Sequence, residues 1–221
     1  MHLTWNSNEK RRVLASNFII VAFMVYSILH MFLAPINNDA LVSNTIEALK
    51  FFTVESNIIV GIAALISFIY NRKDLNPKWV SILKYVATGT VTLTFFTVMV
   101  YLGPLIGYIS LLQGTNLFMH LVTPVYAIFH WFFIEPKSED LKFKHAFLSI
   151  VPSTLYGIVY MTNLAITGGY GTTENDWYAF GTFGLGIGMI VFGVMLLMMY
   201  GLGVLLYFSH IKWFNKKAAT E

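Results

Sequence analysis

The stretch VLASNFIIVAFMVYSILHMFLA at residues 13–34 decides the fold class of this chain. It contains no lysine, arginine, aspartate or glutamate, and it follows the basic cluster Lys10-Arg11-Arg12. A helix needs roughly 20 apolar residues to cross the hydrocarbon core of a bilayer, which is about 30 Å thick. The stretch therefore predicts a membrane-spanning helix that begins beside positive charge and ends before Pro35.

Five further apolar runs have the same character. Charged residues make up 11% of the 221 residues, whereas a soluble domain usually contains about 25%. No segment is polar and long enough to form a separate soluble domain, so we expect a single transmembrane domain over residues 1–221. We predict an all-α, polytopic membrane protein with six transmembrane helices at about 13–34, 45–70, 80–102, 115–134, 146–167 and 180–208.

The basic residues give this predicted topology a direction. Of the 14 lysines and arginines, all except Lys50 precede the first run, follow the last run, or lie around the second and fourth loops. Lys84 is counted with the second loop. Because basic residues remain on the cytoplasmic side of membranes, we expect both termini to be cytoplasmic and the protein to lie in the plasma (inner) membrane. Five or seven spans would break the pattern.

Composition argues against several classes of function. The chain has no cysteine, which excludes disulfides, thiolate catalysis and cysteine metal sites. The basic residues form short clusters beside apolar runs, so we expect no nucleic-acid partner. A metal site formed by His30, Glu55 and His120 is an alternative, but no helix carries a pair of histidines, or of histidine and glutamate, at metal-ligand spacing. We therefore expect neither a metal ion nor another cofactor.

Polar side chains inside the predicted spans carry the functional signal. Thr53, Ser56 and Asn57 share one face of the second span, and Asn116 and His120 share one face of the fourth. Both spans enter the membrane from outside, so these groups come to the same outer level. Buried charge and amide groups are costly in a bilayer, which favours a functional site, while a hydrogen-bond network that joins helices is the alternative.

Further polar groups are expected at the outer ends of other spans or at the inner face. Those at the outer level are His30, Lys50, Glu55, Tyr160 and Asn163. Glu55 points about 200° away from Thr53 in a regular helix. At the inner face, His130, His145 and His210 are expected to be interfacial or solvated.

Three short motifs resemble those of a known family. The segment 51–57 (FFTVESN) resembles the signature of a bacterial six-span family that is itself similar to the androgen-induced, ADTRP-like intramembrane threonine hydrolases. Within those hydrolases, the nucleophile and histidine motifs resemble the segments 51–53 (FFT) and 116–120 (NLFMH). The segment 177–180 (WYAF) is similar to an aromatic motif in that family's last outer loop, with alanine in place of proline. The relatives cleave fatty acid esters of hydroxy fatty acids. The resemblance implies Thr53 as nucleophile and His120 as its partner.

The implied chemistry proceeds through an acyl-threonine. A threonine hydroxyl needs a base to take its proton, and a neutral imidazole is suited to that role near pH 7. The expected oxyanion or substrate-positioning residues are Asn57, Asn116, Ser56 and Glu55, and the possible pocket residues are His30, Tyr160, Asn163, Trp177, Tyr178 and Lys50. A membrane lipid or lipid ester is the expected partner. The alternatives are a non-enzymatic lipid-binding or proton-coupled transport protein that uses the same outer cavity, and a purely structural membrane protein.

Overall fold

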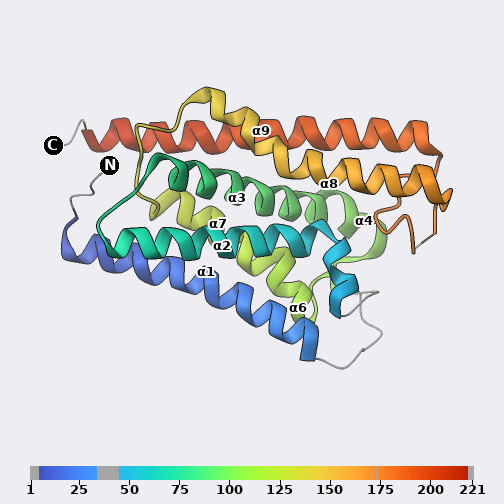
Figure 1. The fold of residues 1–221 in the computed structure, drawn as a ribbon, viewed down its shortest axis with the longest axis horizontal. Coiled ribbons are helices and arrows are strands. Elements are labelled where there is room, and N and C mark those ends of the chain that lie inside the picture. Colours follow the sequence, from blue (N-terminus) through green and yellow to red (C-terminus); the bar gives the residue numbers. More distant parts are fainter. Residues whose placement is uncertain (1–4, 34–44, 173, 219–221) are drawn as a thin grey trace.

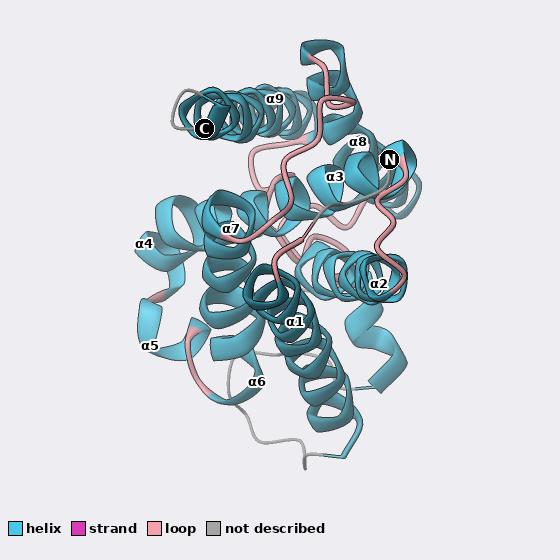
Figure 2. Ribbon diagram, turned by 90° about the vertical axis from the view of Figure 1, so that its left-hand side faces the viewer, coloured by secondary structure: helices cyan, strands magenta, loops and turns pink. Residues whose placement is uncertain are grey.

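The computed structural model describes residues 5–33, 45–172 and 174–218. The chain is mostly helical in these ranges, which contain no strand (Figure 2). Among the described residues, five helices are long and apolar enough to cross a membrane, and this gives the chain the character of a multi-pass membrane protein. Their candidate spans are Ser7–Leu33, Phe52–Arg72, Lys78–Leu105, Phe143–Thr167 and Leu185–Ile211.

These spans are built from long helices, two of which carry short extensions. The elements are α1 (Ser7–Leu33), α2 (Phe52–Arg72), α3 (Lys78–Phe96) continued by η2 (Thr97–Leu102) and α4 (Gly103–Ile106), η4 (Phe143–His145) leading into α8 (Ala146–Thr167), and α9 (Leu185–Ala218). A short 3₁₀ helix, η1 (Thr45–Lys50), precedes α2, and α5 (Tyr108–Leu111) follows α4.

The fourth expected span is a composite helix. It consists of α6 (Gly114–Leu117), η3 (Phe118–Val122) and α7 (Thr123–Phe133), and the backbone stays right-handed helical at both junctions. The middle piece is a π-type turn directly before Pro124. Because proline has no backbone N–H, it removes one hydrogen bond from the preceding turn, and a wider turn accommodates that loss. The same arrangement recurs at η2, which precedes Pro104.

Two element ends differ from the sequence expectation. The second span begins at Phe52 rather than near residue 45, because Phe51 is extended (φ −89°, ψ 127°) and separates η1 from α2. The last span begins at Leu185 rather than Phe180, because Gly184 has a φ of 90°, which ordinary helical residues do not adopt. Residues 180–184 therefore belong to the preceding loop.

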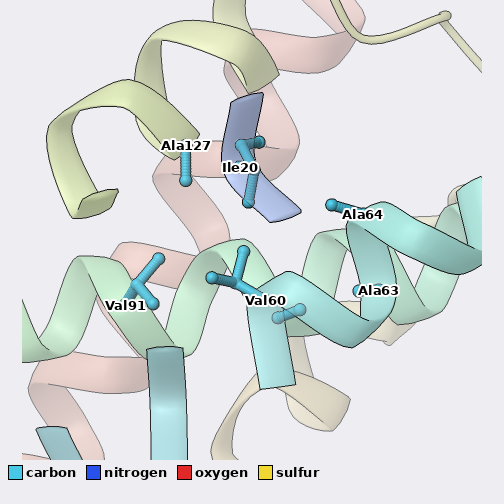
Figure 3. Packing of buried hydrophobic residues seen from close by; sticks show 7 residues of the cluster. Ile20, Val60, Ala63, Ala64, Val91 and Ala127 are labelled. Carbon is cyan, nitrogen blue, oxygen red and sulfur yellow. The ribbon is translucent and has the colours of Figure 1, made fainter. Parts of the chain in front are cut away.

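Helix α3 lies at the centre of the bundle. It packs against α2, α7, α8 and α9, while α1 packs against α2 and α7 (Figure 1). A central cluster joins α1, α2, α3 and α7 through Ile20, Val60, Ala63, Ala64, Ala87, Val91 and Ala127, all almost fully buried (Figure 3). Four of these are alanines, and small side chains allow helices to approach closely in a membrane.

The outer surface of the bundle is apolar along its length. Phe18, Leu155, Val159 and Leu197 are each more than half exposed, and such a surface is favourable against lipid rather than water. Helix α1 begins and α9 ends at the same end of the bundle (Figure 1). The opposite end carries the loop between α8 and α9, and the candidate site lies near that loop.

Candidate functional site

A cavity of about 570 Å³, its open mouth included, lies between α2, α3, η2, α8, α9 and the loop before α9. Most of its wall is apolar and includes Phe52, Leu93, Phe180 and Phe192. The polar groups on the wall are hydroxyls, and they belong to Thr53, Thr94, Thr97, Ser153, Tyr156, Tyr160 and Tyr178. A mostly apolar cavity with a few convergent polar groups is typical of small-molecule sites.

Thr53 lies on the cavity wall in the first turn of α2 and is 8% exposed. Val54 and Glu55 already donate their backbone N–H groups to the Phe51 carbonyl. The N–H groups of Phe52 and Thr53 precede them, at the helix end that carries partial positive charge. The structure therefore sets the Thr53 hydroxyl beside a helix N-terminus, a more electropositive position than the one expected two turns inside a span.

The Tyr178 hydroxyl occupies the space in front of this helix end. It lies close to the Thr53 side chain and to the backbone N–H groups of Phe52 and Thr53, which would stabilise negative charge on its oxygen. Burial raises the pKa of Tyr178 to about 12, although the hydrogen bonds from Thr53 act in the opposite direction. Tyr178 is therefore a neutral phenol near pH 7, and its oxygen lies where an anionic oxygen would be favoured.

The loop at residues 168–184, here called the outer loop, is fastened over the cavity by Asp176. This carboxylate is 3% exposed. One of its oxygens accepts the hydroxyl of Tyr160, and the other accepts the backbone N–H groups of Gly171 (2.9 Å) and Gly181 (3.0 Å). Asn163 adds a bond from its amide to the Asn175 carbonyl at 3.1 Å. The loop is thus tied both to itself and to α8.

A second set of bonds links the outer loop to the start of α2. The Trp177 indole donates to the Tyr156 hydroxyl at 2.8 Å, and that hydroxyl donates to the Lys50 carbonyl at 2.6 Å. The Lys50 ammonium lies 5.6 Å from the ring centroids of both Phe51 and Trp177. Expected pocket residues Tyr160, Trp177, Tyr178 and Lys50 therefore gather at one end of the cavity.

Ala179 has a φ of 58°, in the left-handed region. Proline is restricted to a φ near about −65°, so it would not fit at this position. The backbone next to Tyr178 is therefore compatible with the alanine that the sequence carries and incompatible with proline.

His120 is buried in η3 and oriented by a backbone carbonyl. Its Nδ1 lies 2.6 Å from the Leu111 oxygen. Because a carbonyl only accepts hydrogen bonds, Nδ1 carries the proton and Nε2 is left as the basic nitrogen. This is the tautomer that a general base requires, but His120 does not belong to the cavity lining.

Asn57 connects the two expected motifs. Its amide donates to the Thr53 carbonyl at 2.7 Å and to the Met119 carbonyl at 3.0 Å, so α2 is joined to the residue before His120. Within the described ranges, however, no hydrogen bond joins Thr53 to His120. The structure thus brings the two segments to neighbouring positions through Asn57, without a hydrogen bond between Thr53 and His120 in the described ranges.

The other expected site residues are not part of the cavity lining. Ser56 donates to the Thr53 carbonyl at 3.0 Å and meets the Thr94 hydroxyl at 2.8 Å, and His30 is hydrogen-bonded to Thr115. Asn116 is buried, and its side-chain oxygen has no hydrogen-bond partner in the described part of the chain. His30, Glu55, Asn57 and Asn116 do not line the cavity.

The structure also contains a buried charged cluster that the sequence reading missed. Lys84, expected near a loop, is fully buried in α3 and donates to Asn17 of α1. His130, expected to be interfacial or solvated, is also fully buried, with Nδ1 2.7 Å from the Ser16 hydroxyl and Nε2 2.5 Å from Glu135.

The same expectation was wrong for His145 and His210, which are 5% and 2% exposed. Packing of α9 against α7 and the fourth loop explains the second case, because His210 stacks on Trp131 and accepts the backbone N–H of Ser138 at 2.9 Å. The sequence did contain one sign of this buried cluster, the polar pair Ser16-Asn17 inside an otherwise apolar run. Polar side chains that are buried need hydrogen-bond partners, which predicts other polar groups nearby.

The loop after α7 supplies the other charges of this cluster. Burial alone would raise the pKa of Glu135, but the hydrogen bond from His130 and the nearby Lys84 lower it below its ordinary value. Burial lowers the pKa of Lys137 to about 8, and the Glu135 carboxylate offsets part of that effect. The Lys137 ammonium donates to the Trp131 carbonyl at 3.0 Å and thereby caps α7. The cluster thus holds α1, α3 and α7 together at the end opposite the outer loop.

Comparison with known proteins identifies no relative of this chain, so a proposed function rests on the geometry of the candidate site. Within the described residues, no group of three histidine, cysteine, aspartate or glutamate side chains is arranged to hold a metal ion. The chain matches no family model, no curated protein and no solved structure.

Proposed function

We propose that this protein is an intramembrane hydrolase that cleaves a lipid ester through an acyl-threonine, with Thr53 as nucleophile and His120 as base. The observation that carries the proposal is the position of Thr53, on the wall of a largely apolar cavity and beside the N-terminus of α2. A nucleophile in that position attacks a carbonyl whose developing negative charge is stabilised by the helix end.

The proposal includes six transmembrane helices with both termini cytoplasmic in the plasma membrane. Residues 114–133 supply the fourth crossing, since a helix of that length extends about 30 Å. An even number of crossings is supported by the position of the α1 start and the α9 end at the same end of the bundle (Figure 1). The basic residues near that end support its cytoplasmic orientation.

The proposed substrate class is a fatty acid ester of a hydroxy fatty acid or a similar lipid ester. The apolar wall of the cavity suits an acyl chain, and the hydroxyl groups on that wall suit the polar ester group. Lys50 at that end supplies a cation for a free carboxylate on the substrate. An acyl chain of this kind enters laterally from the bilayer, where such esters partition.

The reaction begins when the ester carbonyl oxygen displaces the Tyr178 hydroxyl from the N-terminus of α2. The Thr53 oxygen then attacks the carbonyl carbon, and its proton passes to Nε2 of His120. The leaving alkoxide takes that proton as the carbon–oxygen bond breaks, and water hydrolyses the acyl-threonine to release the acid. Because no hydrogen bond joins Thr53 to His120, the proposal requires a side-chain rotation or one intervening water before proton transfer.

The experiment is hydrolysis of a long-chain fluorogenic ester by purified full-length protein in lipid nanodiscs. Thr53→Ala and His120→Gln should each lower turnover by at least about 100-fold, the usual contribution of a nucleophile or base. Thr53→Ser should retain part of the activity. Thr97→Ala is the matched control, because Thr97 lines the same cavity from η2 and has no role in the proposed reaction. Full turnover by Thr53→Ala would disprove the hydrolase proposal.

A second candidate is a non-enzymatic lipid-binding or proton-coupled transport protein. It is favoured by one observation, the lack of a hydrogen bond between Thr53 and His120 in the described chain. This candidate predicts saturable binding of a lipid ester without turnover. It also predicts proton-coupled flux in liposomes that persists in Thr53→Ala and fails in Glu55→Gln.

A further inference from the structure

A second hollow lies at the other end of the bundle, between the start of α1 and the end of α2. It is an open groove with an empty volume of about 950 Å³, the solvent at its mouth included. Three basic side chains, those of Lys10, Arg11 and Arg72, form part of its lining. The apolar part consists mainly of Leu14, Phe18 and Phe68. We call this hollow the basic groove.

The charges of the basic groove are not equally available. Lys10 is paired with Asp74 at 2.6 Å, which ties the first turns of α1 to the turn that follows α2. Arg11 and Arg72 are exposed, and the Arg72 guanidinium lies 6.0 Å from the Phe68 ring centroid. Two guanidinium groups from two different helices thus face one groove, and guanidinium binds phosphate oxygens in a bidentate manner.

The apolar lining continues from these charges along the helices. Phe18 lies two turns beyond Arg11 on α1 and is 61% exposed, and its ring centroid is 6.5 Å from that of Phe68 on α2. An exposed phenylalanine packed on a half-buried one, next to positive charge, is matched by a ligand that has an anionic head and a hydrocarbon tail. A soluble anion would leave the aromatic surface uncovered.

We propose that the basic groove binds one anionic phospholipid, with its phosphate on Arg11 and Arg72 and an acyl chain along Phe18 and Phe68. The site is independent of the Thr53 cavity, because it lies at the opposite end of the bundle and shares no lining residue with it. A zwitterionic lipid carries a choline or ethanolamine cation that the two arginines would repel, and therefore binds less well.

The test uses the full chain in a mild detergent, titrated with palmitoyl-oleoyl phosphatidylglycerol or the matching phosphatidylcholine and observed by native mass spectrometry. We expect saturation by one phosphatidylglycerol and at least about 10-fold weaker binding of phosphatidylcholine. The variant Arg11→Gln/Arg72→Gln should bind phosphatidylglycerol about 10- to 30-fold more weakly than the unmodified protein.

The matched control is Arg12→Gln/Lys73→Gln, which removes two exposed cations from neighbouring positions that do not line the groove. This control should keep the affinity for phosphatidylglycerol. Equal losses in both double variants would overturn the proposal in favour of a general surface-charge effect. Equal binding of the two lipids by the unmodified protein would also overturn it, and that comparison needs no variant to fold.

A further arm separates a lipid from a free anion. Phe18→Ala should weaken long-chain phosphatidylglycerol and leave the affinity for a dibutyryl analogue unchanged. Inorganic phosphate at millimolar concentration should not displace the long-chain lipid. Displacement by phosphate, together with no effect of Phe18→Ala, would show that the groove recognises phosphate alone.

Discussion

The side-chain amide of Asn57 donates to the backbone carbonyl of Met119 at 3.0 Å, and this bond joins α2 to the helix that carries His120. The same amide also donates to the Thr53 carbonyl. A single buried side chain therefore sets the separation of the proposed nucleophile and base, and the following predictions start from it.

Asn57→Ala should lower both stability and activity. Two carbonyl groups lose their donor, and buried interhelical bonds in membranes contribute about 0.6 kcal/mol each. We expect a loss of about 1 kcal/mol in reversible unfolding and a larger relative loss of ester turnover, because η3 moves relative to Thr53. Asn163→Ala, which removes one loop contact, is the comparison. Unchanged turnover in Asn57→Ala would contradict a positioning role.

Asp176→Asn should loosen the outer loop. An amide keeps one acceptor oxygen, whereas the carboxylate accepts Tyr160 on one oxygen and Gly171 and Gly181 on the other. Hydrogen exchange at the Gly171 and Gly181 amides should become at least about 10-fold faster, which corresponds to the loss of a charge-assisted bond. Glu174→Gln, an exposed acid in the same loop, should exchange like the unmodified protein.

Tyr178→Phe should increase kcat/KM if the hydrolase proposal is correct. The Tyr178 hydroxyl competes with the substrate for the N–H groups of Phe52 and Thr53, and a typical net hydrogen bond contributes about 1 kcal/mol, or roughly fivefold in rate. Tyr156→Phe should act in the opposite sense, because it breaks the link between Trp177 and Lys50. A fall in kcat/KM for Tyr178→Phe would instead identify Tyr178 as a positioning donor.

Glu135→Ala should be strongly destabilising. It leaves the buried Lys84 without the nearby carboxylate and removes the partner of His130. Removal of one member of a buried ionic group costs about 3–5 kcal/mol. Glu139→Ala in the same loop is exposed and should change unfolding by less than about 0.5 kcal/mol. Similar unfolding temperatures for the two variants would contradict this assignment.

The lowered pKa of Lys137 predicts that the stability of the folded protein rises with pH in the alkaline range. Burial lowers the pKa of Lys137 to about 8 from the ordinary 10.5. Between these values the unfolded chain still binds a proton that the folded protein has released, so stability increases as pH rises from 8 to 10.5. The thermal unfolding temperature of Lys137→Gln should lack this component, whereas that of Lys142→Gln should retain it.

Much of the fold was predictable because it depends on local composition. Long apolar runs near 13–34, 45–70, 80–102, 146–167 and 180–208 correspond to helices that can cross a membrane. The ends were less predictable: the turn at Phe51 and the positive φ of Gly184 shorten two spans. The π-type turn of η3 before Pro124 also has no signature in hydropathy, since it depends on how the helix accommodates a missing N–H.

The candidate site was predictable in part. The i, i+3, i+4 spacing brought Thr53, Ser56 and Asn57 to one face, and Asn57 does contact the fourth span. Sequence spacing did not reveal that the free N–H groups at the start of α2, rather than the amides of Asn57 and Asn116, face Tyr178. It also did not reveal that Lys84 and His130 are buried together with Glu135.

The amino-acid sequence alone determined the helical, membrane-type character of this protein and the basic clusters along it, because helix length and hydrophobicity are properties of short segments. Only the tertiary structure decided which polar groups meet. The outer loop, more than 110 residues after Thr53, brings Tyr178 to the N-terminus of α2, and α1, α3 and α7 meet around Lys84. Those contacts depend on helix rotation and close packing, and no short segment specifies either.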